Sequence, residues 1–280
     1  MAPQPIGLHN RSYRQQTNGG IIMIGAIIGD IVGSRFEFNN HRSTDFDLFG
    51  PGCNYTDDTV MTVAVADAII HNASFKEKML EYGRRFSLPM GGYGGSFGRW
   101  LHSINPQPYD SFGNGSAMRV SPCALLSKGN REWALAKAAC SAMPTHNHPE
   151  GIKGALATTD AILMAFDGAS KEDMRMYLTE LYGYDLDFTC DDIRATNQFN
   201  ETCMVTVPQA IVAFLDSSSF EDAIRLAVSI GGDSDTIAAI CGPIAEAFYG
   251  VPTSIKKKAL RMLPTSLAKV VNEMYKLSKK

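Results

Sequence analysis

Apolar residues recur along this chain mainly with the period of an α-helix. From Gly151 onward, Ile152, Ala155, Leu156, Thr159, Ile162, Leu163 and Phe166 fall on one face of such a helix. The same spacing, with polar residues suited to helix caps, predicts helices after residues 56–58 and 233–236 and over 75–87, 116–127, 131–142, 171–182, 200–215, 219–229, 253–262 and 265–277. Few segments alternate with a period of two, so strands should be minor or absent and the fold class all-α.

The apolar run at residues 21–33 is compatible with a helix or a strand by its length alone. Gly25, Gly29 and Gly33 stand four residues apart, which on a helix would form one smooth stripe suited to close packing. This spacing differs from the GxGxxG pattern, so a dinucleotide-binding fingerprint is not supported. Near the other end of the chain, Pro243 falls inside an apolar helical run and is expected to kink or split that helix.

Two short acidic segments each open an apolar helical run, Thr56-Asp57-Asp58 early in the chain and Asp233-Ser234-Asp235-Thr236 near its end. The simplest interpretation is helix capping, because Thr, Ser and Asp are favoured N-cap residues and acids suit the positive end of the helix dipole. Capping requires one side-chain oxygen, however, and each segment offers several. Neighbouring carboxylates also repel unless a cation neutralises them. We therefore expect the two helix ends to meet and to hold divalent cations in an oxygen shell.

Two further segments, 89–95 and 111–119, are rich in glycine and aromatic residues. The second runs directly into an apolar helix, so its backbone N–H groups are suited to holding phosphate oxygens. An ordinary loop ahead of a helix start is the alternative. Arg119, at the end of this segment, is the only obvious candidate for a basic phosphate clamp.

The chain has 280 residues, 45% of them hydrophobic, which is enough for the core of one large domain or two small ones. No linker interrupts residues 21–280, and the two acidic segments need each other, so we expect a single domain there. Residues 1–20 are polar and lack the apolar core of a signal peptide, and we expect a disordered extension.

The formal net charge is −3, which gives no indication of a nucleic-acid-binding surface. No apolar stretch is long enough to predict a transmembrane helix, so no membrane partner is expected. The six cysteines form no CxxC pair, and Cys140 and Cys241 lie in apolar runs where a buried free thiol is common. This usage predicts a reducing, cytoplasmic compartment.

Five segments occur in an order typical of one enzyme family. They are Gly25 to Asp30, Tyr55 to Thr59, Gly113 to Arg119, Thr145-His146 and Gly231 to Thr236. Together they resemble the ADP-ribosylglycohydrolases of the dinitrogenase-reductase-activating glycohydrolase type, over roughly residues 23–260. The two acidic motifs together are highly specific for this family, whereas each glycine loop alone is not. The resemblance implies a single orthogonal helical bundle.

The resemblance also implies a site with two Mg²⁺ ions, for which Mn²⁺ is the alternative. Its ligands would be Thr56, Asp57, Asp58, Asp233, Asp235 and Thr236. The substrate's diphosphate and distal ribose would lie against Ser111, Phe112, Gly113, Asn114 and Gly115, with His146 near the ADP-ribose. Glu37 matches an acid that acts on the scissile bond in some members, and Asp57 and Asp58 would share the catalytic role. The 90–95 loop carries no carboxylate, so no catalytic acid is expected there.

The implied activity is hydrolysis of the glycosidic bond at C1 of the distal ribose, which frees ADP-ribose from a modified acceptor. Arginine on a protein is the expected acceptor, and serine or a nucleic acid is the alternative. A non-catalytic ADP-ribose-binding or crystallin-like member of the same fold is a second hypothesis, which the intact acidic segments argue against. A two-metal phosphoesterase, with the acidic segments holding a phosphate, is a third.

Overall fold

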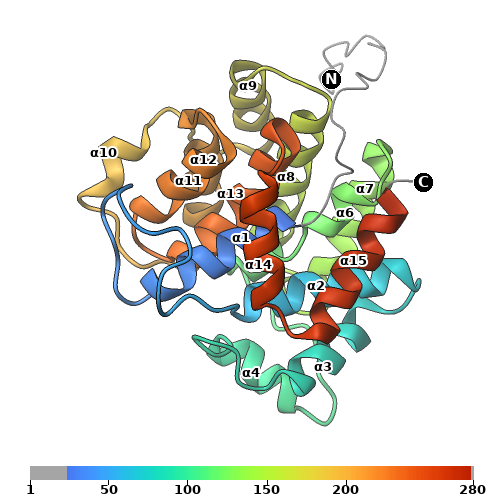
Figure 1. The fold of residues 1–280 in the computed structure, drawn as a ribbon. Helices are drawn as coiled ribbons and strands as arrows, with labels where there is room; N and C mark the ends of the chain where they lie inside the picture. Colours follow the sequence, from blue (N-terminus) through green and yellow to red (C-terminus); the bar gives the residue numbers. More distant parts are fainter. Residues whose placement is uncertain (1–23, 279–280) are drawn as a thin grey trace, which may run out of the picture.

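The glycine-spaced segment forms the first helix, α1 (Ile24–Gly33), which is buried along its whole length at the centre of the molecule (Figure 1). The computed structural model describes residues 24–278, so the extension expected at residues 1–20 lies outside them. The described residues contain no strand, only two isolated bridges, Thr56 with Met90 and Gly113 with Thr202. The all-α prediction is therefore confirmed.

The face of α1 that carries the glycines lies directly against α13 (Ser234–Tyr249). A Cβ atom added to Gly29 would lie 2.0 Å from the carbonyl oxygen of Ala238, and one at Gly25 would lie 2.4 Å from that of Gly242. Only a residue without a side chain permits two helix backbones to approach so closely. At the start of α1, the Glu246 carboxylate of α13 accepts a hydrogen bond from the Gly25 N–H at 2.7 Å, which satisfies one of the free donors of that helix end.

The other end of α1 fixes the start of α2 (Asp57–Ile70). The buried Asp30 carboxylate accepts hydrogen bonds from the backbone N–H groups of Thr56 at 3.0 Å and Thr59 at 3.1 Å, and from the Thr59 hydroxyl. A carboxylate at this place satisfies the free donors of the first turn and interacts favourably with the positive end of the helix dipole. One central helix thus positions both helices that begin with acidic segments.

The remaining helices surround this pair (Figure 1). They are η1 (Ser34–Phe36), α3 (Phe75–Arg85), α4 (Gly95–His102), α5 (Gly115–Met118), α6 (Ser121–Leu125), α7 (Arg131–Ala142), α8 (Pro149–Phe166), α9 (Lys171–Tyr182), α10 (Cys190–Arg194), α11 (Cys203–Asp216), α12 (Phe220–Ser229), α14 (Thr253–Met262) and α15 (Thr265–Ser278). α8, α11 and α12 pack on α13, α14 packs on α1, and α3 and α15 pack on α2.

Several expectations from the sequence need correction. The helix expected over 116–127 is split into α5 and α6, because Pro122 has no N–H group to continue the hydrogen-bond ladder and instead lies in the first turn of a new helix. The helix expected from residue 200 begins at Cys203, because the segment before it is extended beside Gly113. α13 continues past Pro243 without a break, because the buried contacts with its neighbours hold it together.

The prediction of a buried thiol is confirmed for Cys241 and wrong for Cys140, which is exposed. Cys140 is exposed because α7 turns its small residues Ala134, Ala138 and Ser141 to the core and presents Cys140 on the opposite face. All six cysteines are free thiols.

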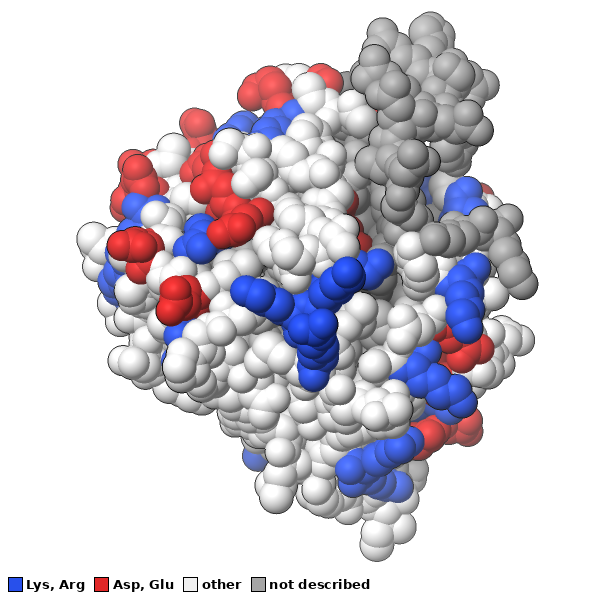
Figure 2. Space-filling view, viewed as in Figure 1, with Lys and Arg blue, Asp and Glu red and all other residues white. Residues whose placement is uncertain are grey.

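The surface shown in Figure 2 mixes both signs of charge. Its most evident basic patch lies over α14, which carries Lys256, Lys257 and Lys258. Acidic and basic side chains are interspersed over the rest of this face, so it presents no extended basic surface. Within residues 24–278, no helix combines the length and apolarity needed to cross a membrane.

The contact between α1 and α13 leads to a stability prediction. Gly29→Ala should lower the free energy of unfolding by about 3 kcal/mol or more, because its Cβ would overlap backbone atoms of α13 that cannot move separately. The matched control is Gly98→Ala in α4, where a Cβ would meet no atom within 4 Å and should be neutral or stabilise by up to about 1 kcal/mol. Urea unfolding of both variants measures the difference. Similar free energies of unfolding for the two variants would contradict the close contact between α1 and α13 at Gly29.

Candidate active site

Both acidic segments stand at helix N-termini, and the two ends face one cleft of about 400 Å³. The cleft is lined by Glu37, Phe38, Asp57, Asp58, Met61, residues 91–97, Tyr109, Ser111, residues 113–115, Met118, Arg119, His146, Glu201, Asp233, Asp235 and Thr236. Six of these residues are acids and one is an arginine. The acids cannot all ionise in so small a space without a counter-charge.

The first acidic segment combines a cap with free carboxylates. Thr56 is the N-cap of α2, and its hydroxyl accepts a hydrogen bond from the Asp58 N–H at 3.1 Å. Thr56 is buried and does not line the cleft, so capping explains this residue. Capping does not explain Asp57 and Asp58, which both line the cleft. Asp58 is buried, and its Oδ2 atom has no hydrogen-bond partner.

The second acidic segment departs further from capping. Asp233 occupies the N-cap position of α13, yet its side chain does not cap the helix. Its Oδ2 atom instead accepts a hydrogen bond from the Asn114 side chain at 2.6 Å. The Oδ1 atom of Asp235 is buried and has no partner. Carboxylate oxygens of Glu37, Asp233 and Asp235 lie within 4.8 Å of one another.

This crowding changes the protonation of the acids. Burial raises the pKa of Asp58 and Asp235 well above the ordinary value, and the neighbouring carboxylates add to the rise. Burial likewise raises the pKa of Asp30 to about 6 and that of Glu37 to about 8, the latter with a contribution from the charge of Asp233. Without a cation, the cluster therefore holds protons at neutral pH.

The cluster fits divalent cations with oxygen ligands. Asp58 and Asp235 both line the cleft, and each has one buried oxygen without a hydrogen-bond partner. No basic side chain forms an ion pair with the acidic segments among the described residues. An all-oxygen set of carboxylates and a threonine hydroxyl is the kind of shell that Mg²⁺ or Mn²⁺ prefers.

The glycine loop borders the acidic cluster and is joined to it by Asn114. The Asn114 side chain bonds to Asp233, and its backbone N–H donates to the Glu201 carbonyl at 2.7 Å. Ser111, Gly113, Asn114 and Gly115 line the cleft as expected. Phe112 does not line it, because its ring is turned outward against His148, with ring centroids 5.4 Å apart.

Arg119 lies behind this loop, fully buried at the end of the cleft. Its guanidinium donates to the Ser141 carbonyl at 3.0 Å and to the Thr145 hydroxyl at 2.8 Å, and its Nε atom has no partner. The Thr145 hydroxyl also bonds to His146 Nδ1 at 2.7 Å. Burial and the charge of Arg119 hold the pKa of His146 well below its ordinary value, so His146 is neutral. Its Nε2 atom faces the glycine loop, 3.0 Å from the position of a Cβ added to Gly115.

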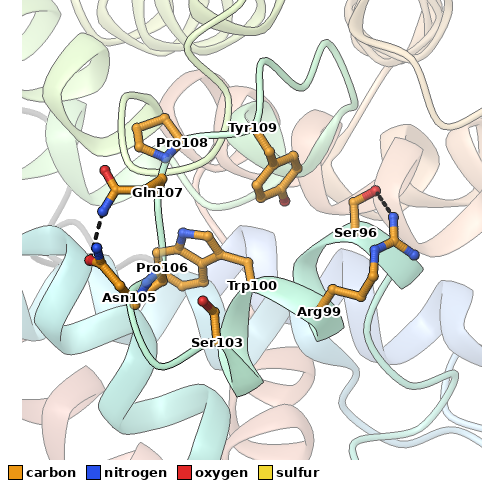
Figure 3. Close-up of a pocket in the computed structure, with 9 residues that line it drawn as sticks. All are labelled: Ser96, Arg99, Trp100, Ser103, Asn105, Pro106, Gln107, Pro108 and Tyr109. Carbon is orange, nitrogen blue, oxygen red and sulfur yellow. Dashed lines mark hydrogen bonds between the residues drawn. The ribbon is translucent and has the colours of Figure 1, made fainter.

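Glu37 lines the cleft next to the 90–95 loop, which carries no carboxylate. Gly91 has φ +76°, and a Cβ there would lie 2.6 Å from Glu37 Oε2, so glycine is needed both for the backbone and for the contact. Residues 91–97 continue along the cleft wall. Beyond them lies a second, open pocket of about 510 Å³ between α4 and residues 103–109 (Figure 3). It shares Ser96 and Tyr109 with the cleft.

The structure brings together all the predicted site residues except Thr56 and Phe112, which do not line the cleft. It adds residues that sequence reasoning did not assign, chiefly Asp30 and Glu201. Asp30 is the only charged residue in α1, and a charge on a wholly buried helix is a signal that could have identified it. Glu201 has no comparable signal, because its position depends on the pairing of residues 200–203 with the glycine loop.

This chain is similar to known proteins over most of its length. The sequence profile of the ADP-ribosylglycohydrolase family matches residues 15–280. An ADP-ribosylarginine hydrolase Tri1 of Pseudomonas putida (strain GB-1) is 24% identical over 82% of this chain and 70% of its own length. The ADP-ribosylhydrolase ARH3 of Homo sapiens is 26% identical over 82% of this chain and 84% of its own.

A solved structure described as an ADP-ribosylglycohydrolase-related protein complex has the same fold. It superimposes with a TM-score of 0.67 over 91% of this chain and 96% of its own, at 24% sequence identity. With the family profile spanning nearly the whole chain, the resemblance inferred from the motifs is confirmed, and this chain belongs to the ADP-ribosylglycohydrolase family of hydrolases.

Proposed function

We propose that this protein hydrolyses the glycosidic bond at C1 of the distal ribose and so releases ADP-ribose from a modified acceptor. The acceptor that we propose is arginine on a protein, because the relative from Pseudomonas putida is named an ADP-ribosylarginine hydrolase. We further propose that two Mg²⁺ ions, replaceable by Mn²⁺, are required.

One observation carries the proposal: Asp58 and Asp235, which line the same cleft beside a glycine loop, each have a buried oxygen without a hydrogen-bond partner. Leaving such oxygens without a partner is unfavourable unless a ligand completes the site. The same cleft offers a glycine-rich loop and a neutral histidine on the side where a diphosphate would lie. Cations and a phosphate-binding loop in one cleft suit ADP-ribose better than a simple phosphate ester.

The chain's own residues have distinct roles in this proposal. Asp57, Asp58, Asp233, Asp235 and Thr236, with Thr56 behind them, would hold the cations, which when bound would polarise the ribose hydroxyls and a water molecule. The glycine loop and His146 would bind the diphosphate. Glu37, half-buried near the cleft mouth, would hold or transfer a proton at the atom that joins the acceptor to C1. The narrow cleft would exclude bulk water from this bond.

The direct test is a panel of substrates in which ADP-ribose is linked to arginine, serine or a nucleic acid, each incubated with protein and Mg²⁺. Release of free ADP-ribose from the arginine conjugate is the expected result. Release of AMP would instead indicate the phosphoesterase hypothesis. Binding of ADP-ribose without release from any conjugate would indicate the non-catalytic hypothesis.

The metal assignment predicts a change in thermal stability. Mg²⁺ should raise the melting temperature of the wild type, because it binds only the folded protein, and should raise that of Asp235→Asn much less. Without metal, Asp235→Asn should be at least as stable as the wild type, since it removes one of several repelling carboxylates. Differential scanning fluorimetry measures both, with the exposed Asp45→Asn as the control that should behave as wild type. An equal Mg²⁺ effect on Asp235→Asn would remove Asp235 from the ligand set.

The raised pKa values predict a pH dependence of the metal-free protein. The folded state keeps protons on Asp30 up to about pH 6 and on Glu37 up to about pH 8, whereas the unfolded chain loses them near pH 4. The folded state therefore binds more protons than the unfolded chain in this range. The free energy of unfolding should for this reason fall as pH rises from about 4 to 8. Melting temperatures in EDTA from pH 5 to 8 should show this fall, and a smaller one in Asp235→Asn. A melting temperature that rises with pH by the same amount in both proteins would show that the carboxylates do not raise one another's pKa values.

The role of Glu37 predicts a separation of binding from rate. Glu37→Gln should keep the affinity for ADP-ribose within a few-fold and lose on the order of 10²-fold or more in single-turnover rate, the usual scale for a positioned acid or base. Calorimetry and rapid-quench cleavage of the arginine conjugate provide the two measurements, with the exposed Glu132→Gln of α7 as the control. A Glu37→Gln enzyme with near wild-type rate would place the chemistry on Asp57 and Asp58.

A further inference from the structure

Two aromatic rings stand exposed at the mouth of the cleft. Phe38 follows Glu37, lines the cleft and is 73% exposed, and Phe199 is 44% exposed. Their ring centroids are 5.8 Å apart, although the residues come from segments far apart in the sequence. Single exposed apolar side chains are common on protein surfaces, but a pair assembled from two segments beside a cleft indicates a contact with a ligand.

The segments that carry these rings are fixed to the acidic site. The Asn40 side chain donates to the Gly232 carbonyl at 2.8 Å and accepts from the Gly232 N–H at 2.9 Å. The Asn197 side chain donates to the Gly231 carbonyl at 3.1 Å and is held in turn by Gln209 at 2.8 Å. Two asparagines therefore bind the turn before Asp233, and each holds one of the aromatic rings in a defined place next to the acids.

One carboxylate stands beside the aromatic pair at this mouth. Glu201 is exposed, lines the cleft and lies two residues beyond Phe199, and the guanidinium of the neighbouring Arg42 is taken up by the Asn197 and Ile230 carbonyls. The single arginine of the cleft lining, Arg119, is fully buried behind the glycine loop. A ligand group bound between the aromatic pair and Glu201 would therefore be favoured if it were cationic and planar. A guanidinium meets both conditions, because it stacks on aromatic faces and pairs with carboxylates.

We propose that Phe38, Phe199 and Glu201 form the acceptor subsite and select an acceptor that carries a guanidinium group. This inference rests on the proposed function and specifies its substrate. The linked arginine keeps its positive charge and flat shape, so the rings would bind its face and Glu201 its edge. A serine acceptor has neither property and would gain nothing from these residues.

The test compares kcat/KM for arginine-linked and serine-linked ADP-ribosyl peptides in the wild type, Phe199→Ala, Phe199→Tyr and Glu201→Gln. In Phe199→Ala the ratio of the arginine value to the serine value should fall about tenfold, the scale of one cation–π contact of about 1.4 kcal/mol. Phe199→Tyr should keep the ratio, and Glu201→Gln should lower it in a salt-dependent way. The affinity for free ADP-ribose, which has no acceptor, should stay within twofold. Leu181→Ala, an exposed apolar residue on α9, is the matched control.

Several outcomes of this experiment would overturn the acceptor subsite. An unchanged ratio in Phe199→Ala overturns the proposal, and so does an equal change in Leu181→Ala. Weaker binding of free ADP-ribose to Phe199→Ala would assign the ring to the nucleotide instead of the acceptor. If the wild type releases ADP-ribose from no conjugate, the proposed function fails, and calorimetry with the intact peptides decides the inference. It stands if the arginine peptide binds more tightly than the serine peptide and Phe199→Ala removes the difference, and it falls otherwise.

Discussion

The backbone contact between α1 and α13 is the constraint on which the rest of the structure depends. Three glycines at intervals of four residues remove every side chain from one face of α1, and α13 occupies the space. The contact places the end of α1 beside the start of α13. Asp30 then fixes the start of α2 at the same place by accepting its free N–H groups. A packing requirement of two helices thus determines where the acidic residues of three segments lie.

The site brings its carboxyl groups together at the expense of stability in the absence of a ligand. Carboxylates that are buried together raise one another's pKa, and unpartnered oxygens on Asp58 and Asp235 are costly in a folded protein. The surrounding framework has to hold these groups in place, and it does so with direct backbone contacts and with asparagine side chains that bond to Asp233 or to the turn before it. Asn40, Asn114 and Asn197 all have this role. They are neutral, so they position the acids without neutralising them.

The sequence predicted the parts of this arrangement that are local. Cap residues such as Ser74 and Ser219 marked the starts of α3 and α12, and the paired acidic segments pointed to the candidate site. Features that depend on contacts between distant segments were not predictable. The acceptor role of Asp30 requires knowing that α2 begins beside α1, and the outward turn of Phe112 depends on the position of His148. The exposure of Cys140 depends on which face of α7 meets the core, and its apolar neighbours do not reveal that.

The separation of the acidic segments also has a consequence for biosynthesis. α1 and α2 leave the ribosome about 160 residues before α13 is synthesised. Until α13 appears, the glycine face of α1 has no partner and the carboxylates of α2 have no second group of acids to meet. A chain that terminates before Ser234 therefore cannot assemble the catalytic cleft at all. The synthesis of α13 therefore precedes any hydrolytic competence.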